Sequence, residues 1–208
     1  MANDELGLTG LKPFVRAGER VNSEYYRINT AQALYRFQPV AMNNSGQVQV
    51  HPVIAELSPL LGPVLNFIDT AQAGLPANLT DLTQNGFLDS SVNALARVAD
   101  DPNQLYMLEE DTGGTLIGTE NSAGQTVLWT YTATTGNTTT GVANVVLDRS
   151  TLATTTGPTL TIVKAYREYV NRDGTINDTS LSFAKWIVFI NTQQRDKNQL
   201  GRRSLWPT

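Results

Sequence analysis

The sequence contains no cysteine among its 208 residues. Disulfides, thiolate zinc sites, iron–sulfur clusters and thiol catalysis are therefore excluded. A chain of this length can bury a hydrophobic core without such cross-links. The fold must be held by the packing of its own side chains, as one domain with or without extended arms.

Histidine is almost absent, and His51 is the only one. A catalytic triad would need a nucleophile beside it, and the sequence has no G-x-S-x-G elbow to supply a serine. No phosphate-binding loop is present either, because the glycines at 113–114 lack the Lys-Ser/Thr ending of a P-loop. We expect no enzymatic activity, no cofactor and no metal site.

Acidic side chains gather in two places. Asp100 and Asp101 are adjacent, whereas glycosidase carboxylates come from separate elements that face a cleft. Residues 109–111 offer carboxylate oxygens for a hard cation but lack the alternating ligand spacing of a calcium loop. We interpret both groups as turn residues.

Charge and hydropathy also set limits. The formal net charge is -4 at pH 7, and the basic residues are spread too thinly for a nucleic-acid surface. The acidic N-terminus is not followed by a signal sequence, and no apolar run is long enough to span a membrane. We expect a soluble protein made in the cytoplasm, with no nucleic acid and no membrane among its partners.

Short apolar and β-branched runs recur between turn signals, which is typical of a β-sandwich or barrel. Residues 43–46 predict a tight turn that joins strands at 39–42 and 47–50. Another turn is expected at 171–174. Further strands are expected at 25–30, 33–37, 125–131, 142–147, 159–169 and 180–191. The predicted fold class is all-β (mainly β), a compact β-sandwich or barrel-like domain with a short helical insertion and extended arms.

Two segments predict helices within this framework. Residues 58–74 place apolar side chains at helical spacing between Ser58, a capping residue, and Gly74. Residues 89–96 form a shorter candidate, with capping residues at its start. We expect the 52–91 region to cover one face of a sheet. The threonine-rich segment 132–140 lacks apolar alternation and predicts an exposed loop.

The predicted organisation has three parts: an extended N-terminal arm at 1–23, a single mainly-β domain at 24–194 with a helical and loop insertion at 52–96, and a tail at 195–208. Large apolar residues are unfavourable in a solvated arm, so we expect the arm to dock on another surface. Trp and Arg in the tail are favoured interface anchors. The candidate contact residues are Leu11, Phe14, Val15, Arg16, Arg202, Arg203 and Trp206.

The stretch from 96 to 110 contains a turn with a clear physical cause. Pro102 fixes its own φ and pushes Asp101 out of the helical region, while Asp and Asn side chains bond nearby backbone. We expect the chain to enter and leave this turn extended. The turn comprises Asp100, Asp101, Pro102 and Asn103.

Three stretches, in this order, resemble a known family. They read D-D-P-N-Q at 100–104, G-N-T-T-T-G at 136–141 and F-A-K-W-I-V-F-I-N at 183–191. The sequence resembles the tailed-bacteriophage capsid decoration proteins, also called cement proteins, over roughly its C-terminal half. The chain departs from the family pattern in a longer 52–91 region and in a different turn at 166–179.

The resemblance implies binding to the outer surface of the assembled phage head, at junctions between major capsid protein subunits. It also implies a homotrimer at local three-fold axes that stabilises the shell, so we expect the protein in the virion. Deletion of 1–23 is expected to leave a folded protein that no longer loads onto shells.

Two alternatives remain open at the level of sequence. One is another virion component, a head fibre or a receptor-binding tail protein, with the 132–140 loop as a contact tip. The other is a carbohydrate-binding β-sandwich with Trp129, Tyr131 and Trp186 on one exposed face.

Overall fold

The part of the chain that the structure describes is almost entirely β, with 51% of it in strands and 3% in helical turns. It was obtained as a computed structural model. The structure describes residues 3, 9–15, 19–29, 32–51, 59–69, 87–88, 94–113, 117–118, 122–152 and 160–191. The all-β prediction is confirmed: two antiparallel sheets, one of them curled into a half-barrel, form the molecule.

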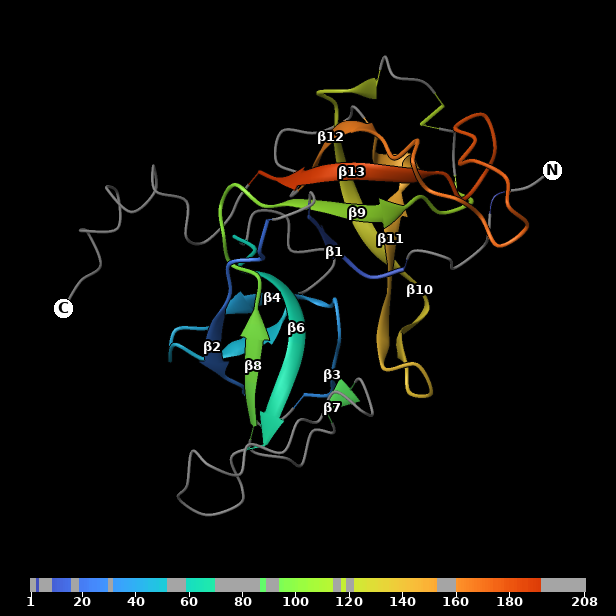
Figure 1. The fold of residues 1–208 in the computed structure, drawn as a ribbon. Coiled ribbons are helices and arrows are strands. Elements are labelled where there is room, and N and C mark those ends of the chain that lie inside the picture. The colour runs from blue at the N-terminus through green and yellow to red at the C-terminus, as the bar shows by residue number, and fades with distance from the viewer. Residues whose placement is uncertain are drawn as a thin grey trace.

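The larger sheet has six strands in the order β1-β9-β13-β12-β10-β11 and lies in the upper half of Figure 1. All of its pairings are antiparallel. Its central strands carry Val, Ile, Leu and aromatic residues, which suit a pleated, buried surface. The strands are β1 (Lys12–Phe14), β9 (Leu105–Glu109), β10 (Thr126–Asn137), β11 (Val142–Asp148), β12 (Leu160–Ala165) and β13 (Lys185–Ile190), and a 3-10 turn, η4 (Arg149–Thr151), follows β11.

The smaller sheet has five strands in the order β2-β8-β6-β4-β5 and lies in the lower half of Figure 1. Its strands are β2 (Glu24–Arg27), β4 (Pro39–Met42), β5 (Val48–Val50), β6 (Gly62–Asp69) and β8 (Ala94–Val98). The expected β4–β5 hairpin is confirmed, and its turn is closed because Asn43 Oδ1 accepts from the Ser45 and Gln47 amides, both at 2.9 Å. A two-stranded pair, β3 (Leu34–Tyr35) with β7 (Phe87–Leu88), lies beside it.

The 100–104 turn joins the two sheets, because β8 ends just before it and β9 begins just after it. The Asn103 amide donates to Asp101 Oδ1 (2.8 Å), and the Gln104 amide donates to the Asp101 carbonyl (3.1 Å). The predicted turn with extended chain on both sides is therefore confirmed. Its position makes this turn the link between the two halves of the molecule.

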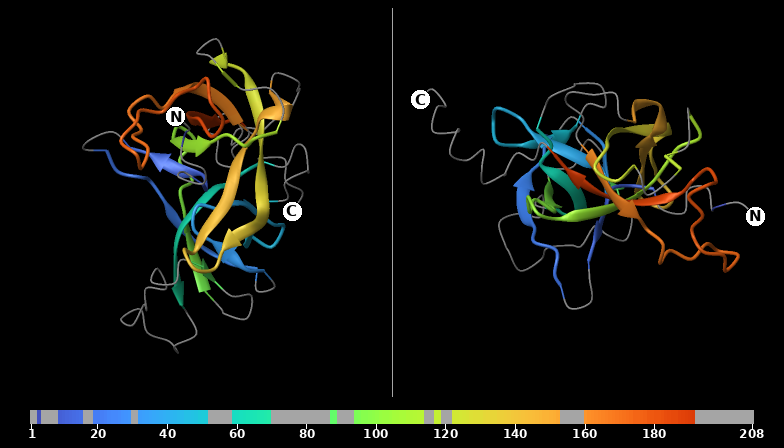
Figure 2. Two further views of the ribbon diagram at one scale, coloured as in Figure 1. Left: turned by 90° about the vertical axis from the view of Figure 1, so that its right-hand side faces the viewer. Right: turned by 90° about the horizontal axis from the view of Figure 1, so that it is seen from above.

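The β10–β11 hairpin is the second link between the halves. It runs from the six-stranded sheet down beside the five-stranded one, as Figure 1 and the left view of Figure 2 show. Near its tip Gly136 lies so close to Tyr35 that an added Cβ would be 2.3 Å from the ring. A residue without a side chain is required there.

Two hydrophobic cores result. The larger one lies mainly within the six-stranded half, where it includes Tyr106, Trp129 and Trp186, and it also contains Tyr35 of β3 and Leu60, which precedes β6. The smaller one lies within the five-stranded half and includes Val64 and Phe67. Each sheet thus buries its own inner face, as layered β architectures require.

The predicted helix at 58–74 is wrong over its described part, because residues 62–69 form strand β6. The apolar spacing that suggested a helix here serves a strand that pairs with both β4 and β8. Gly62 has φ +152°, and a Cβ there would lie 1.8 Å from the Ala99 carbonyl oxygen. Pairing with the neighbouring strands therefore overrides the helical spacing of the apolar residues. Residues 70–74 of the predicted helix lie outside the described residues.

The second predicted helix, at 89–96, is also wrong over its described part, since β8 begins at Ala94. Its burial alternates along Ala94, Ala96 and Val98, a strand period that the sequence already contained. The predicted exposed loop at 132–140 is wrong over 132–137, because β10 continues to Asn137 through a register shift, and it is confirmed at 138–140. Only residues 138–141 form the turn.

The segment expected to be an extended arm contributes a strand and a core residue to the fold. Strand β1 pairs with β9 at the edge of the larger sheet, and Leu11 is 0% exposed in the larger core. Deletion of residues 1–23 would remove an edge strand and a core side chain. That deletion therefore cannot separate loading onto shells from folding, contrary to our expectation from the sequence.

Candidate interaction surface

The connection between β12 and β13, residues 166–184, projects from the side of the six-stranded sheet (orange to red in Figures 1 and 2). Its outer part is a small hairpin in which the Asn171 amide donates to the Thr175 carbonyl (2.8 Å). The Gly174 amide donates to the Asn171 carbonyl (2.9 Å) and Gly174 has φ +82°. The expected turn at 171–174 is confirmed, and glycine suits its left-handed backbone.

Val170 and Ile176 face each other across this hairpin as an antiparallel bridge. They are 59% and 65% exposed, more than any other large apolar side chain in the described part of the chain. Paired side chains in such a bridge lie about 5 Å apart, so the two form one patch. A contiguous apolar patch held in water on a projecting loop is typical of an interaction site.

The hairpin tip beside this patch carries charge of both signs. Arg172 and Asp173 are both exposed. Hydrogen bonds from the Thr175 hydroxyl and amide hold the pKa of Asp173 below its ordinary value, so its carboxylate stays ionised. The patch is thus rimmed by polar groups, the arrangement found at protein interfaces.

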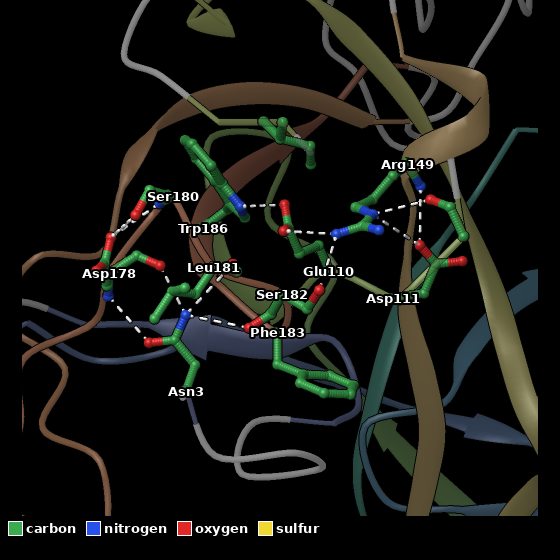
Figure 3. Close-up of polar contacts among 12 residues, drawn as sticks. Asn3, Glu110, Asp111, Arg149, Asp178, Ser180, Leu181, Ser182, Phe183 and Trp186 are labelled. Carbon is green, nitrogen blue, oxygen red and sulfur yellow. Dashed lines mark hydrogen bonds and ion pairs between the residues drawn. The ribbon is translucent and has the colours of Figure 1, made fainter. Parts of the chain in front are cut away.

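Asn3 fixes the inner part of the loop from a distant point in the sequence. Its Nδ2 donates to the carbonyls of Asp178 (2.6 Å) and Ser182 (3.1 Å), and its Oδ1 accepts from the Asp178 amide (2.9 Å). Asn171 Nδ2 donates to the same Oδ1 at 3.3 Å. Figure 3 shows Asn3 lying against the 178–183 backbone, where one amide side chain satisfies several buried backbone groups.

A second asparagine closes the base of the loop. Asn177 Nδ2 donates to the Lys185 carbonyl (2.9 Å) and the Tyr166 carbonyl (3.2 Å). Its Oδ1 accepts from the Lys185 amide (2.9 Å). These bonds tie the loop to the first residue of β13 and hold its two ends together.

A buried ionic cluster lies under the loop. Arg149 Nη1 is 3.3 Å from Glu110 Oε1, and Trp186 Nε1 donates to Glu110 Oε2 at 3.1 Å. Arg149 also donates to the Gly113 carbonyl (2.8 Å) and to Ser182 Oγ (3.4 Å). Figure 3 shows this chain of contacts running from η4 across the sheet to the loop.

The cluster changes the proton affinity of Glu110. Burial raises the pKa of this carboxyl to about 7, although the Trp186 and Arg149 hydrogen bonds and the Arg149 charge act in the opposite direction. Burial also raises the pKa of Asp111, which lies 3.7 Å from Arg149 Nε. An ionised group in this interior is unfavourable unless it is paired with an opposite charge. Arg149 supplies that charge and so reduces the free-energy cost of ionising Glu110.

A second buried ion pair connects the first residue of β13 with the last residue of β9. Lys185 Nζ is 3.6 Å from Glu109 Oε2, and both side chains are fully buried. Lys185 Nζ also donates to the Phe183 carbonyl (2.7 Å) and lies 5.1 Å from the centre of the Tyr169 ring. The loop residues Tyr169 and Phe183 are therefore held by a charge that the sheet supplies.

The acidic residues considered from sequence are engaged by side chains of the protein itself. Glu109, Glu110 and Asp111 all pair with Lys185 or Arg149, so they do not form the solvated turn that we expected. Among the described residues, no group of three or more His, Cys, Asp or Glu is arranged to hold a metal ion. Within the same residues, no helix is long and apolar enough to cross a membrane.

The only histidine and the tryptophans of the described chain are interior residues. His51 is buried, and its ring centre is 5.5 Å from that of Trp129. Trp129 is 2% exposed and Trp186 is 0% exposed. The exposed aromatic face on which a carbohydrate-binding alternative depends is therefore not formed by these two residues.

The structure places three of the candidate contact residues, and the contact role itself stays a prediction. Leu11 lies in the protein's own core. Phe14 is half-buried, with its ring 5.7 Å from that of Tyr166, and Val15 is exposed. The other four, Arg16, Arg202, Arg203 and Trp206, lie outside the described residues.

The family-motif turn is held by its own side chains. Asp100 accepts a hydrogen bond from the Tyr26 hydroxyl, and Asp101 Oδ2 accepts from Asn22 Nδ2 at 2.7 Å. These bonds connect the turn to β2, which contains Tyr26, and to Asn22 just before it. The carboxylates of Asp100 and Asp101 therefore stabilise the junction between the two sheets.

Sequence reasoning missed Val170, Ile176 and Asn3. The first two had a signal, because V-N-R-D-G-T-I places apolar residues symmetrically around a D-G turn, as in a hairpin. Asn3 had none, since its partners are about 170 residues away. No protein-family model, curated protein or solved structure significantly matches this chain.

Proposed function

We propose that this protein decorates the outer surface of an assembled phage head, where it binds the major capsid protein at subunit junctions and stabilises the shell. The proposal rests on the resemblance of the 100–104, 136–141 and 183–191 stretches to the capsid decoration family. The structural observation that favours a binding role is the exposed Val170–Ile176 patch on a loop fixed by buried contacts.

The three stretches have connected roles in the fold, which supports treating them as one pattern. The first joins the sheets and leads into β9, and the third forms β13, which pairs with β9 through Leu105 and Phe189. The second forms the tip of the β10–β11 hairpin, where the Thr139 amide donates to Asn137 Oδ1 (2.8 Å). Proteins built on the same framework would keep such stretches in the same order along the chain.

A rigid loop suits this function because binding does not have to order it. Each immobilised side chain or loop residue subtracts from binding free energy, so a preformed loop keeps more of the gain from burial. Complete burial of a Val or Ile side chain contributes roughly 1.5–3 kcal/mol, and the partly exposed pair would supply less than the sum.

Repetition of such modest contacts gives strong overall binding. A trimer at a local three-fold axis would present the patch three times, and simultaneous engagement raises the overall affinity far above that of one contact. Capsomers held together in this way are harder to separate. A shell under internal pressure would therefore resist rupture better when decorated.

The proposal is tested by sedimenting the purified protein with empty expanded shells of the phage that encodes it. We expect saturable binding near one copy per major capsid protein and a higher melting temperature of the shells. A double substitution, Val170→Ser with Ile176→Ser, should weaken binding at least tenfold while the protein stays folded.

Val163→Ser is the matched control, because Val163 is also an exposed valine but lies on β12 outside the loop. This variant should bind as the unmodified protein does. Absence of binding by the unmodified protein, or a dozen or fewer copies per virion, would contradict the decoration role and point to a fibre or tail component.

A further inference from the structure

A pocket opens beside the 100–104 turn, at the edge of the six-stranded sheet. Its volume is about 420 Å³, and Phe14 and Leu105 contribute its apolar part. Glu19, Arg20 and Asp101 contribute charged groups, so among the described lining residues the acidic side chains outnumber the basic one. Asp101 is held in place by hydrogen bonds from Asn22 and the Asn103 amide.

The register of the sheet places the end of β13 next to this pocket. Phe14 pairs with Leu105, and Leu105 pairs with Phe189 on the other side. Adjacent strands are about 4.8 Å apart, so Phe189 lies about 10 Å from Phe14. Because β13 runs antiparallel to β9, it ends where β9 begins, as Figure 1 shows at the left edge of the upper sheet.

Strand β13 therefore ends on the pocket's side of the sheet. Residues 192–208 lie outside the described residues, and 17 extended residues would span up to about 55 Å, far more than the distance required. This segment carries four basic side chains, Arg195, Lys197, Arg202 and Arg203, against one acidic side chain, and it contains Trp206.

The chemistry of the segment complements that of the pocket. An indole is a large apolar group that suits a floor made by Phe14 and Leu105. Arg202 and Arg203, four and three residues before Trp206, can pair with the carboxylates of the pocket, and arginine is the cation best suited to carboxylates.

We propose that the pocket receives the chain's own 192–208 segment, with Trp206 against Phe14 and Leu105 and the arginines beside Glu19 and Asp101. The inference does not depend on the proposed function, because it concerns the free protein. Tethering gives the segment an effective concentration on the order of 1 mM, so an intrinsic Kd of about 100 μM would leave roughly nine molecules in ten docked.

The test uses the full chain labelled with 5-fluorotryptophan and observed by 19F NMR. Three resonances are expected, and Trp206→Phe identifies the one from the segment. We expect the Trp206 resonance to differ from that of the free peptide 192–208. Glu19→Gln combined with Asp101→Asn should lower the docking equilibrium constant about tenfold, which leaves about half of the molecules docked and moves this resonance about halfway to the free-peptide position.

The other two tryptophans report the fold in the same spectrum. Trp129 and Trp186 are buried, and their resonances should not move when the pocket is changed. Glu168→Gln with Asp173→Asn is the matched control, since it removes two exposed acidic groups outside the pocket and should leave the Trp206 resonance in place.

Two outcomes would overturn the inference. One is a Trp206 resonance at the free-peptide position in the unmodified chain. The other is a shift that appears only as the protein concentration rises, which would assign the pocket to a second copy. A docked segment in a protein that fails to bind shells would leave this inference standing and remove only the decoration role.

Discussion

The two halves of the molecule are stabilised by different means. The five-stranded half encloses a core of apolar residues, including Leu61, Val64 and Phe67. The six-stranded half also has an apolar core but buries two ion pairs, Glu110 with Arg149 and Glu109 with Lys185. Both pairs lie on the side from which the 166–184 loop projects.

The difference shows what each half is arranged to do. Apolar burial stabilises a sheet without specifying one geometry for what is attached to it. Buried ion pairs are costly to desolvate and add little net stability, but they penalise any arrangement that leaves a charge unpaired. In this protein that penalty falls on the loop that carries Val170 and Ile176.

The largest effect should come from Arg149→Met measured at pH 8, where Glu110 is ionised in the folded protein. The substitution leaves a buried carboxylate without its cation, which costs about 3–5 kcal/mol of unfolding free energy. Arg149 also contacts Ser182, so amide exchange in residues 178–183 should accelerate more than in the rest of the protein. Denaturant unfolding and hydrogen exchange measure the two effects.

Phe67→Ala in the five-stranded half is the matched comparison. Phe67 is 0% exposed, and its truncation should cost a similar 3–5 kcal/mol. Exchange in residues 178–183 should then rise only with global unfolding. Equal local acceleration in both variants would mean that the ionic cluster has no special connection to the loop.

The next largest effect is a pH dependence of stability. The pKa of Glu110 is raised from 4.5 to about 7 in the folded protein, so between these values the folded state binds a proton that the unfolded chain has lost. The stabilisation is complete below pH 4.5 and is lost as pH rises through 7. Unfolding free energy should fall by on the order of 2–3 kcal/mol between pH 4.5 and 8.5.

Glu110→Gln should flatten this pH profile, because a neutral amide does not titrate. Denaturant unfolding at several pH values provides the measurement. Asp111 contributes in the same direction, since burial raises its pKa too, so a shallow slope should remain. An undiminished slope in Glu110→Gln would show that another group titrates.

The smallest of these effects should follow Asn3→Ala. Several backbone groups of the loop lose their partner, and we expect a loss of about 1–2 kcal/mol. Asn43→Ala is the comparison, because Asn43 closes a turn in the other half but its acceptor contacts are at the surface. Amide exchange at Asp178 should accelerate in the first variant and stay unchanged in the second.

The sequence was sufficient for features that depend on neighbouring residues. The turn at 100–104 and the hairpin at 43–46 follow from Pro, Asp, Asn and Gly acting on adjacent backbone. Strand β6 could not be recognised, because its spacing of Leu, Val and Ile also fits a helix. Only pairing with β4 and β8, which are distant in sequence, decides between the two.

The candidate surface shows the same division. The hairpin that carries Val170 and Ile176 has a local signal, whereas its supports come from Asn3, Glu110 and Arg149. These residues are far from the loop in the sequence. A charged residue at a strand end is also predicted from the sequence to be exposed. Burial of such a residue is a property of the complete sheet, so composition and periodicity do not reveal it.

We propose that the six-stranded half meets the shell through the 166–184 loop. This contact can be seen in a cryo-EM map of shells saturated with the unmodified protein. We expect density for the protein on the outer surface at subunit junctions, with Val170 and Ile176 in contact with the major capsid protein. A map in which the five-stranded half or the β10–β11 tip makes the contact, with the loop facing solvent, would contradict it.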